Sequence, residues 1–139
     1  MSIDTMKNAL ETYLKTNVTT TAIKYNMTSY YELNGVALNQ SQIDALDFFI
    51  APSIVPISQD REMMSSSNPF RYEIFFQIDI YSKPTDGMGA TYEAVDDLET
   101  LFREKTISNI VCLRTETIST IEKDGWVITP YRILCYLWG

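Results

Sequence analysis

The chain has 139 residues, with 11 basic side chains, 18 acidic side chains, no histidine and a formal net charge of −7 at pH 7. This length suits one domain that can bury a substantial hydrophobic core. The negative charge argues against attraction to nucleic-acid phosphates, which requires a basic face. Without histidine, the sequence excludes a Ser-His-Asp triad, a Cys-His pair and any metal site that uses imidazole ligands.

The N-terminal third is predicted to hold a helix followed by short strands. Apolar residues recur at helical spacing from Ile3 to Leu14, and Asn17 marks the expected end of this helix. Thr19 to Tyr25 is rich in threonine and suits a first strand. Asn34-Gly35 is a tight-turn signal that indicates a small hairpin. Ser41 to Asp47 is interpreted as a short turn of helix.

A second main strand is predicted from Phe48 to Ser58. Pro52 and Pro56 restrict this strand to an edge or a bulged position, because proline cannot donate to a sheet ladder. The polar stretch Gln59 to Asn68 has no periodicity and is predicted to be a long exposed loop. Long structureless loops in compact domains tend to be functional or disordered.

Residues 69–105 are predicted to form the central unit of the fold, a strand, a turn and a helix. Apolar and polar side chains alternate from Arg71 to Tyr81, which is typical of a strand with one buried face. Lys83 to Gly89 is dense in turn-forming residues. The apolar period then changes to about 3.6, so that one helix face carries Val95, Leu98, Leu101 and Phe102.

The C-terminal part is predicted to be β-rich. Ile107 to Ile121 has strand-forming composition, and Lys123-Asp124-Gly125 is a clear hairpin signal. Trp126 to Trp138 carries large apolar groups on both faces, so this strand is either central or has one face against a partner. The element order predicts a single α+β domain over residues 1–139, with a mostly antiparallel sheet and two helices packed on one face.

The sequence contains no motif that specifies a catalytic, cofactor or metal site. Asp86-Gly87-Met88-Gly89 lacks the third glycine of a dinucleotide fingerprint and the Gly-Lys-Ser/Thr of a P-loop. Glu93, Asp96 and Asp97 could form a Mg²⁺-binding carboxylate cluster, but acidic residues in early helix turns are more often simply solvated. We therefore expect no cofactor.

The compartment is expected to be reducing, and no membrane contact is expected. Cys112 and Cys135 are interpreted as small reduced core residues in preference to a disulfide, because no secretory signal is present. The most apolar run, Phe48 to Ile57, is too short to span a bilayer and contains two prolines.

Several segments together resemble the tail terminator (tail completion) proteins of long-tailed bacteriophages. They are the strand ending in Ile78-Asp79-Ile80-Tyr81, the turn Lys83 to Gly89, the helix that begins Ala90-Thr91-Tyr92 and ends Leu101-Phe102, and the closing Asp124-Gly125-Trp126 and Thr129-Pro130-Tyr131. Chain length and element order are similar over nearly the whole sequence. Only Tyr30 to Gln42 does not match the family pattern.

The resemblance implies a structural virion protein and not an enzyme. Members of the family form a ring, usually a homo-hexamer, that caps the tail tube, stops its polymerisation and meets the head–tail connector. Such a protein would be made in the host cytoplasm and would belong to the tail or neck of the virion. DNA would only pass through the ring lumen, without specific binding, and a negative protein suits that channel.

Two groups of residues are candidates for contacts in such an assembly. The candidate subunit or tube interface consists of Arg61, Glu62, Met63, Met64, Lys83, Pro84, Asp86 and Met88. The candidate acidic surface consists of Glu93, Asp96, Asp97 and Glu99, which could line the lumen or face outward.

Two other functions compete with this hypothesis. The nearer one is another phage neck or tail protein, such as a head–tail connector or a tube subunit. The more distant one is a small soluble enzyme or ligand-binding module, which would need convergent polar groups around a pocket. The sequence does not indicate such a group.

Overall fold

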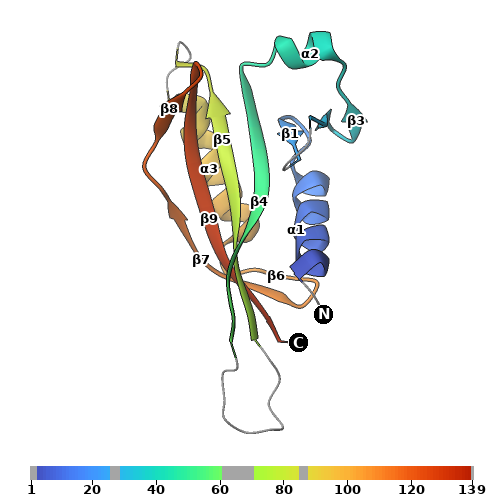
Figure 1. Cartoon of the computed structure of the whole chain (residues 1–139), viewed down its shortest axis with the longest axis vertical. Coiled ribbons are helices and arrows are strands. Elements are labelled where there is room, and N and C mark those ends of the chain that lie inside the picture. The colour runs from blue at the N-terminus through green and yellow to red at the C-terminus, as the bar shows by residue number, and fades with distance from the viewer. Residues whose placement is uncertain (1–2, 26–28, 61–70, 85–87, 139) are drawn as a thin grey trace, which may run out of the picture.

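The computed structural model describes residues 3–25, 29–60, 71–84 and 88–138, which form one α+β domain (Figure 1). The elements in chain order are α1 (Ile3–Asn17), β1 (Ala22–Lys24), β2 (Tyr31–Leu33), β3 (Val36–Ala37), α2 (Gln40–Asp44), β4 (Phe48–Asp60), β5 (Arg71–Ser82), α3 (Gly89–Phe102), β6 (Thr106–Ile107), β7 (Ile110–Thr117), β8 (Ile121–Lys123) and β9 (Trp126–Trp138).

One sheet of nine strands contains all the strands of the described residues. Its order is β3-β2-β1-β4-β5-β9-β7-β6, and β8 pairs with β9 outside this path. Every pair is antiparallel except β1 with β4, which is parallel. The predicted fold class, a mostly antiparallel sheet with helices packed on it, is confirmed.

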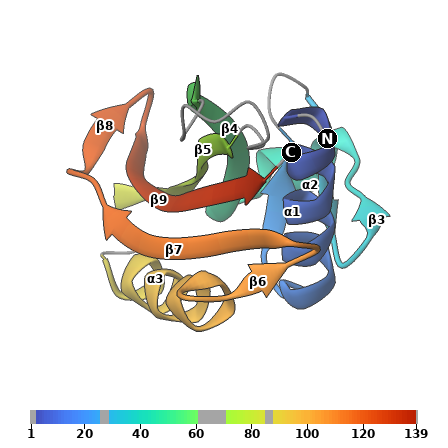
Figure 2. The same ribbon diagram turned by 90° about the horizontal axis from the view of Figure 1, so that it is seen from below.

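The core lies between one face of the sheet and the two long helices. Ile74, Phe76, Ile78 and Ile80 alternate along β5 and are fully buried, as the period of two requires. Helix α1 covers them with Met6, Leu10 and Leu14, and helix α3 covers them with Leu98 and Phe102. Figure 2 shows the two helices against the sheet from below. Each buried side chain of this size contributes about 1.5–3 kcal/mol to folding.

Helix α3 ends within the predicted unit 69–105 and does not reach its last residues. Phe102 is the last helical residue, and Arg103 has extended backbone angles (φ −63°, ψ 123°). Glu104 then takes a positive φ of 56°, and the chain turns back toward the sheet. Lys105 therefore lies beyond the helix, and its carbonyl accepts a hydrogen bond from the Cys112 amide.

Strand β4 lies at an edge for most of its length, as its two prolines predict. It pairs with β5 along its whole length, but with β1 only at Phe49 and Ile50. The register shifts between Pro56 and Ser58, which marks a bulge. The strand continues to Asp60, so the first two residues of the predicted loop belong to the sheet. The rest of that predicted loop lies outside the described residues.

Strand β9 has neighbours on both sides and therefore lies inside the sheet. It pairs with β5 on one side, and with β7 and β8 on the other. Tyr131, Ile133, Cys135 and Leu137 point into the core, whereas Leu134 and Tyr136 on the opposite face are half-buried. Of the two predicted alternatives, the central position is confirmed, and a partner on one face stays a prediction.

Three hairpins turn through positive backbone angles. Asn34-Gly35 and Asp124-Gly125 both have positive φ at each residue, as a type I′ turn requires, and confirm the two predicted hairpins. The pair Ser108-Asn109 (φ 48° and 70°) makes a third turn, between β6 and β7. The β-prone run 107–121 is therefore divided among three strands, because asparagine and serine can also supply this turn.

Phe102 joins both helices to the sheet, which makes it a sensitive test of the core. Its ring centroid lies 5.3 Å from that of Tyr13 on α1 and 5.6 Å from that of Phe76 on β5. We expect Phe102→Ala to lower the free energy of unfolding by about 3–5 kcal/mol in urea titrations, since a buried aromatic ring leaves a cavity. Tyr92→Ala, at an exposed site on the same helix, should change it by no more than about 0.5 kcal/mol.

Candidate functional site

The sheet has a second face, opposite α1 and α3, that neither of these helices covers. We call this surface the outer face, and its residues are Phe49, Val55, Phe75, Gln77, Asp79, Tyr81, Trp126, Ile128, Arg132 and Leu134. They alternate along β4, β5 and β9 with the residues that point into the core. Most of them are half-buried.

Aromatic rings gather at the end of the outer face where β5 meets the turn toward α3. Phe49 stacks on Tyr81 with ring centroids 4.5 Å apart, and Trp126 packs edge-on against Phe49 at 5.0 Å. The Lys83 ammonium lies 4.0 Å from the centroid of the Trp126 ring. A cation over an aromatic face contributes about 0.5–1 kcal/mol at an exposed site, so this contact fixes the start of the turn against the sheet.

Polar side chains cross the middle of the outer face. Arg132 donates to the Gln77 side chain at 2.7 Å, and Gln77 donates to Asp79 at 2.8 Å. The Arg132 guanidinium also lies 5.2 Å from the centroid of the Phe75 ring. Burial raises the pKa of Asp79, although the bond from Gln77 and the charge of Arg132 oppose that change. This row combines aromatic, amide and charged groups without a nucleophile and base in contact.

The predicted interface residues are only partly described. Lys83 lies over Trp126 as above, Pro84 is exposed, and Met88 is the half-buried residue that precedes α3. These three residues flank the turn between β5 and α3. Asp86 and the run Arg61 to Met64 lie outside the described residues.

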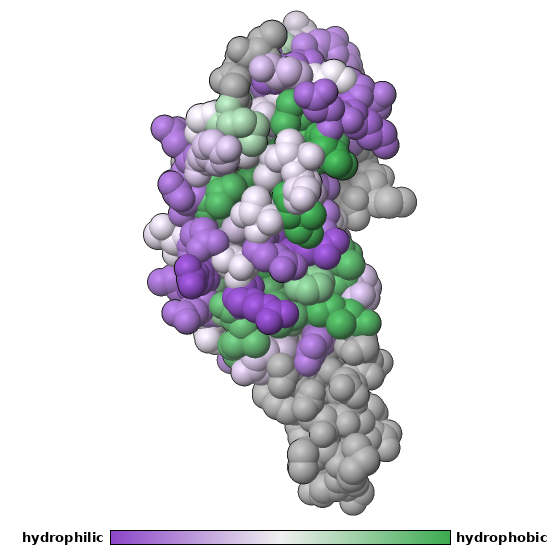
Figure 3. Space-filling model, turned by 90° about the vertical axis from the view of Figure 1, so that its left-hand side faces the viewer, coloured by the Kyte–Doolittle hydropathy of each residue, from purple (hydrophilic) through white to green (hydrophobic). Residues whose placement is uncertain are grey.

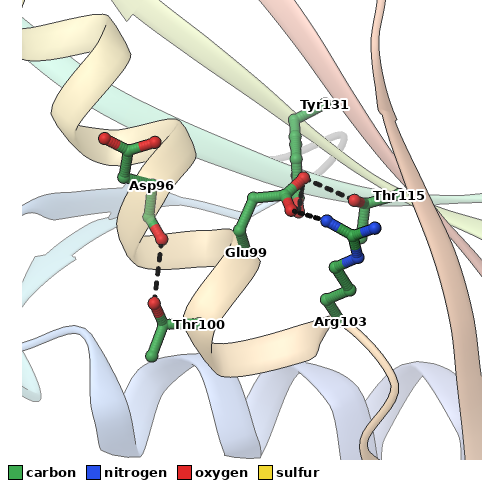
Figure 4. A network of polar contacts seen from close by, with 6 residues as sticks. All are labelled: Asp96, Glu99, Thr100, Arg103, Thr115 and Tyr131. Atoms are coloured by element: carbon green, nitrogen blue, oxygen red, sulfur yellow. Dashed lines mark hydrogen bonds and ion pairs between the residues drawn. The ribbon is translucent and has the colours of Figure 1, made fainter.

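The predicted acidic surface divides into an exposed part and an inward part. Glu93, Asp96 and Asp97 are exposed on α3. Glu99 lies on the same helix but points to the sheet, where it accepts hydrogen bonds from Thr115 on β7 and Tyr131 on β9 (Figure 4). Arg103 completes the group with an ion pair of 3.3 Å. The prediction that Glu99 shares an acidic surface with the other three acids is therefore corrected. Its carboxylate instead holds α3 to two strands.

The environment of Glu99 stabilises its charged form. The hydrogen bond from Thr115 lowers the pKa of Glu99, and the bond from Tyr131 and the charge of Arg103 act in the same direction against the effect of burial. Burial, with the nearby Glu99 charge, raises the pKa of Tyr131, which therefore stays a donor at neutral pH. The role of this group is to position a helix.

A second carboxylate, Glu32 on β2, was not identified from the sequence. It is 3% exposed and accepts hydrogen bonds from the hydroxyls of Tyr25 (2.6 Å) and Tyr30 (3.0 Å). Lys15 on α1 lies 3.5 Å away. Burial opposes the charge of Glu32, but these bonds and the lysine outweigh it, and its pKa is lowered. Glu32 therefore ties the small β2–β3 hairpin to α1.

The described surface offers a cavity but no reactive group in it. A cavity of about 300 Å³ lies between the end of α1, β4 and α3, where Thr19, Thr20, Thr21, Asp97 and Leu98 contribute to its lining. Among residues 3–25, 29–60, 71–84 and 88–138, no cluster of three or more Cys, Asp or Glu side chains could hold a metal ion. None of the described helices is long and apolar enough to cross a membrane.

Hydrophobic groups on the side of the molecule shown in Figure 3 form separate patches with hydrophilic groups between them. In Figure 1 this side is the left-hand one, where β7, β8 and β9 lie. Ile121 on β8 is among the exposed apolar side chains, at 54%. Single exposed apolar side chains such as Ile121 are usual on a protein surface and do not define a binding site.

Comparisons with known proteins establish the fold but not the family. No family model matches the chain, and no curated protein matches it. One solved structure, whose name states no function, is similar over 100% of this chain and 96% of its own, with a TM-score of 0.62 and 14% sequence identity. At this identity, the similarity concerns the fold alone.

The contact between Glu99 and Thr115 predicts a pH-dependent loss of stability. Removal of the donor in Thr115→Val should lower the free energy of unfolding at pH 7 by about 1 kcal/mol. The pKa of Glu99 is lower in the folded than in the unfolded chain, so this stabilisation is present above pH 4.5 and is lost as pH falls through the folded pKa. The difference between variant and parent should therefore shrink in acid, as measured by urea unfolding from pH 3 to 7.

The matched control for this measurement is Thr100→Val. The Thr100 hydroxyl bonds to the Asp96 carbonyl of its own helix and to no carboxylate among the contacts drawn in Figure 4. It should therefore give the same small effect at every pH. If Thr115→Val were equally insensitive to pH, Glu99 would not be the group that holds α3 through its charge.

Proposed function

We propose that the chain is a structural virion protein of a long-tailed bacteriophage, a tail terminator. In this proposal it forms a homo-hexameric ring that caps the tail tube, terminates its polymerisation and joins the tail to the head–tail connector. It acts in the tail or neck of the virion after synthesis in the host cytoplasm. It is not an enzyme, its protein partners are the tube and connector subunits, and DNA only passes through its lumen.

The observation that carries the proposal is the contrast between the two faces of the sheet. One face buries the core under α1 and α3, whereas the outer face keeps Phe75, Arg132 and Leu134 half-exposed on rigid strands. Aromatic side chains and arginine are enriched in protein–protein contacts. A ring requires a contact between two different patches of each subunit, and we assign one of them to the outer face, with a second copy of this chain as its occupant.

The turn at the end of β5 supports this assignment. Lys83 and Pro84, two of the candidate interface residues, lie where the outer face ends, and Lys83 packs on Trp126 of that face. A contact that covers the outer face would therefore reach this turn too. The candidate interface residues Lys83 and Pro84 therefore adjoin the outer face.

The free edge of β4 favours a terminator over a tube subunit. Beyond Ile50, β4 has no partner on its second side among the described residues. Alternate residues of a strand direct their backbone N–H groups to the same edge. Because proline has no N–H, Pro52 and Pro56 fit the pairing with β5 only if this edge faces outward. Ile54 is then the one residue between them whose N–H points outward. This edge resists pairing with a strand of another chain, as suits a subunit that must end an assembly.

The exposed acids on α3 are compatible with a DNA channel. Glu93, Asp96 and Asp97 are exposed on one helix, and their charges would repel phosphate at close range. They would let DNA slide past if α3 lines the lumen, and would serve solubility if α3 faces outward. Reconstruction of the ring by electron microscopy would distinguish these two positions of α3.

The proposed assembly can be measured on the purified protein. We expect closed rings with a central hole in negative-stain images and a hexamer mass in light scattering. Leu134→Lys should abolish the rings, because it places a charge in the middle of the outer face, while circular dichroism still shows a folded chain. Tyr92→Lys, at an exposed site on α3, should assemble as the parent does. Open-ended tubes would contradict the terminator and favour a tube subunit, and a monomer at every concentration would contradict the ring.

The proposed role of the β4 edge gives a separate prediction. Pro52→Val together with Pro56→Val restores two outward N–H donors and removes the features that protect the edge. We expect sedimentation velocity to show species larger than those of the parent, growing with concentration. Tyr92→Val, at an exposed site on α3, should sediment as the parent does. A double variant indistinguishable from the parent would show that the edge does not limit association.

A further inference from the structure

The two cysteines of the chain face each other across neighbouring strands. Cys112 on β7 and Cys135 on β9 are direct partners in the ladder, and their Sγ atoms lie 3.5 Å apart. Both side chains are buried in the core, with 1% and 0% of their surface exposed. They are 23 residues apart in sequence, so the sheet brings them together.

The backbone around Cys112 leaves room for a bond between the two sulfur atoms. The Cys112 amide donates to the Lys105 carbonyl and therefore points away from β9. Cys112 and Cys135 thus form a non-hydrogen-bonded pair, in which the Cα atoms approach to about 4.5 Å, within the range that a disulfide spans. The ladder register shifts just beyond Cys112, so β7 can adjust where the sulfur atoms must approach.

A small molecule can come close to the pair from one side. A cavity of about 430 Å³ lies between α1 and the β6–β7 turn, and Ile110 and Leu137 contribute to its lining. Ile110 lies two residues before Cys112 on the same face of β7, and Leu137 lies two residues after Cys135 on the same face of β9. The cavity lining therefore includes the next side chain along the same face from each thiol.

We propose that Cys112 and Cys135 are an oxidation site that forms a disulfide between β7 and β9 in the folded chain, with hydrogen peroxide as the oxidant. The Cys112 thiolate attacks the peroxide O–O bond and becomes a sulfenic acid, and the released hydroxide takes a proton to form water. The Cys135 thiol then displaces the sulfenic hydroxyl as a second water. Two thiols and one peroxide thereby give one disulfide and two waters.

The hydrogen bond between the thiols selects the sulfur that reacts first. Cys135 donates to Cys112, and this bond lowers the pKa of Cys112 against the effect of burial. The same bond, with burial, raises the pKa of Cys135. Cys112 is therefore the better thiolate, and Cys135 keeps the proton that the second step consumes.

The disulfide would fix β7 to β9 and restrict the unfolded chain. A loop of this length between the linked residues should raise the melting temperature by roughly 5 to 10 °C. The site needs no partner chain, so it is independent of the proposed ring. It would make the protein more stable once it has left a reducing cytosol.

The test compares the full chain after treatment with dilute hydrogen peroxide and after treatment with dithiothreitol. We expect the oxidised sample to lose both titratable thiols in denaturant, to give one peptide that links Cys112 to Cys135 after digestion, and to melt higher. Dithiothreitol should return both thiols and the lower melting temperature. Because peroxide also oxidises methionine, Cys112→Ala and Cys135→Ala are treated in parallel, and neither should gain melting temperature.

Three results would overturn the proposal. They are thiols that stay unreacted until the chain is unfolded, sulfinic acid at Cys112 in place of the linked peptide, and a disulfide that joins two chains on a non-reducing gel. A linked peptide that forms without any rise in melting temperature would retain the site and reject its stabilising effect.

Discussion

Burial of one face of β5 is the constraint on which the rest of the structure depends. Ile74, Phe76, Ile78 and Ile80 have no exposed surface, and both long helices pack on the layer that they form. Strands β4 and β9 flank β5 and are in register with it over most of their length. Because side chains alternate, a slip of one residue would bring Gln77 and Asp79 into the core, so a single register holds the sheet, the helices and the outer face together.

The parts of the fold that could be predicted from sequence depend on local signals. Alternation in β5 and the period of 3.6 in α1 and α3 come from residues close in the chain, and each specifies its own element. Asn34-Gly35 and Asp124-Gly125 are also local, since only a few residue types accept two successive positive φ values. The prolines of β4 indicate an edge for the same reason, because each removes its own donor.

The parts that could not be predicted depend on contacts between distant segments. Ser108-Asn109 turns the chain without glycine, so its signal is weak. Glu99 resembles the neighbouring acids of α3 in sequence, and only the arrival of Thr115 and Tyr131 from two strands distinguishes it. Glu32 likewise acquires its burial from Lys15 and Tyr25. The candidate interface stays a prediction, and only the sheet shows that Lys83 and Pro84 lie beside the outer face.

The place of β9 in the sheet also determines when the sheet can become complete during synthesis. This strand lies between β5 and β7, yet it follows both along the chain. Until β9 has left the ribosome, β5 lacks a partner on one side and the core lacks Tyr131, Ile133 and Cys135. The pairs of β9 with β5 and with β7 join segments distant in sequence and must form at the same stage. Folding is therefore slower than for a helical protein of equal length. The outer face is therefore complete only after β9 has been made, and a nascent chain that lacks β9 cannot present it.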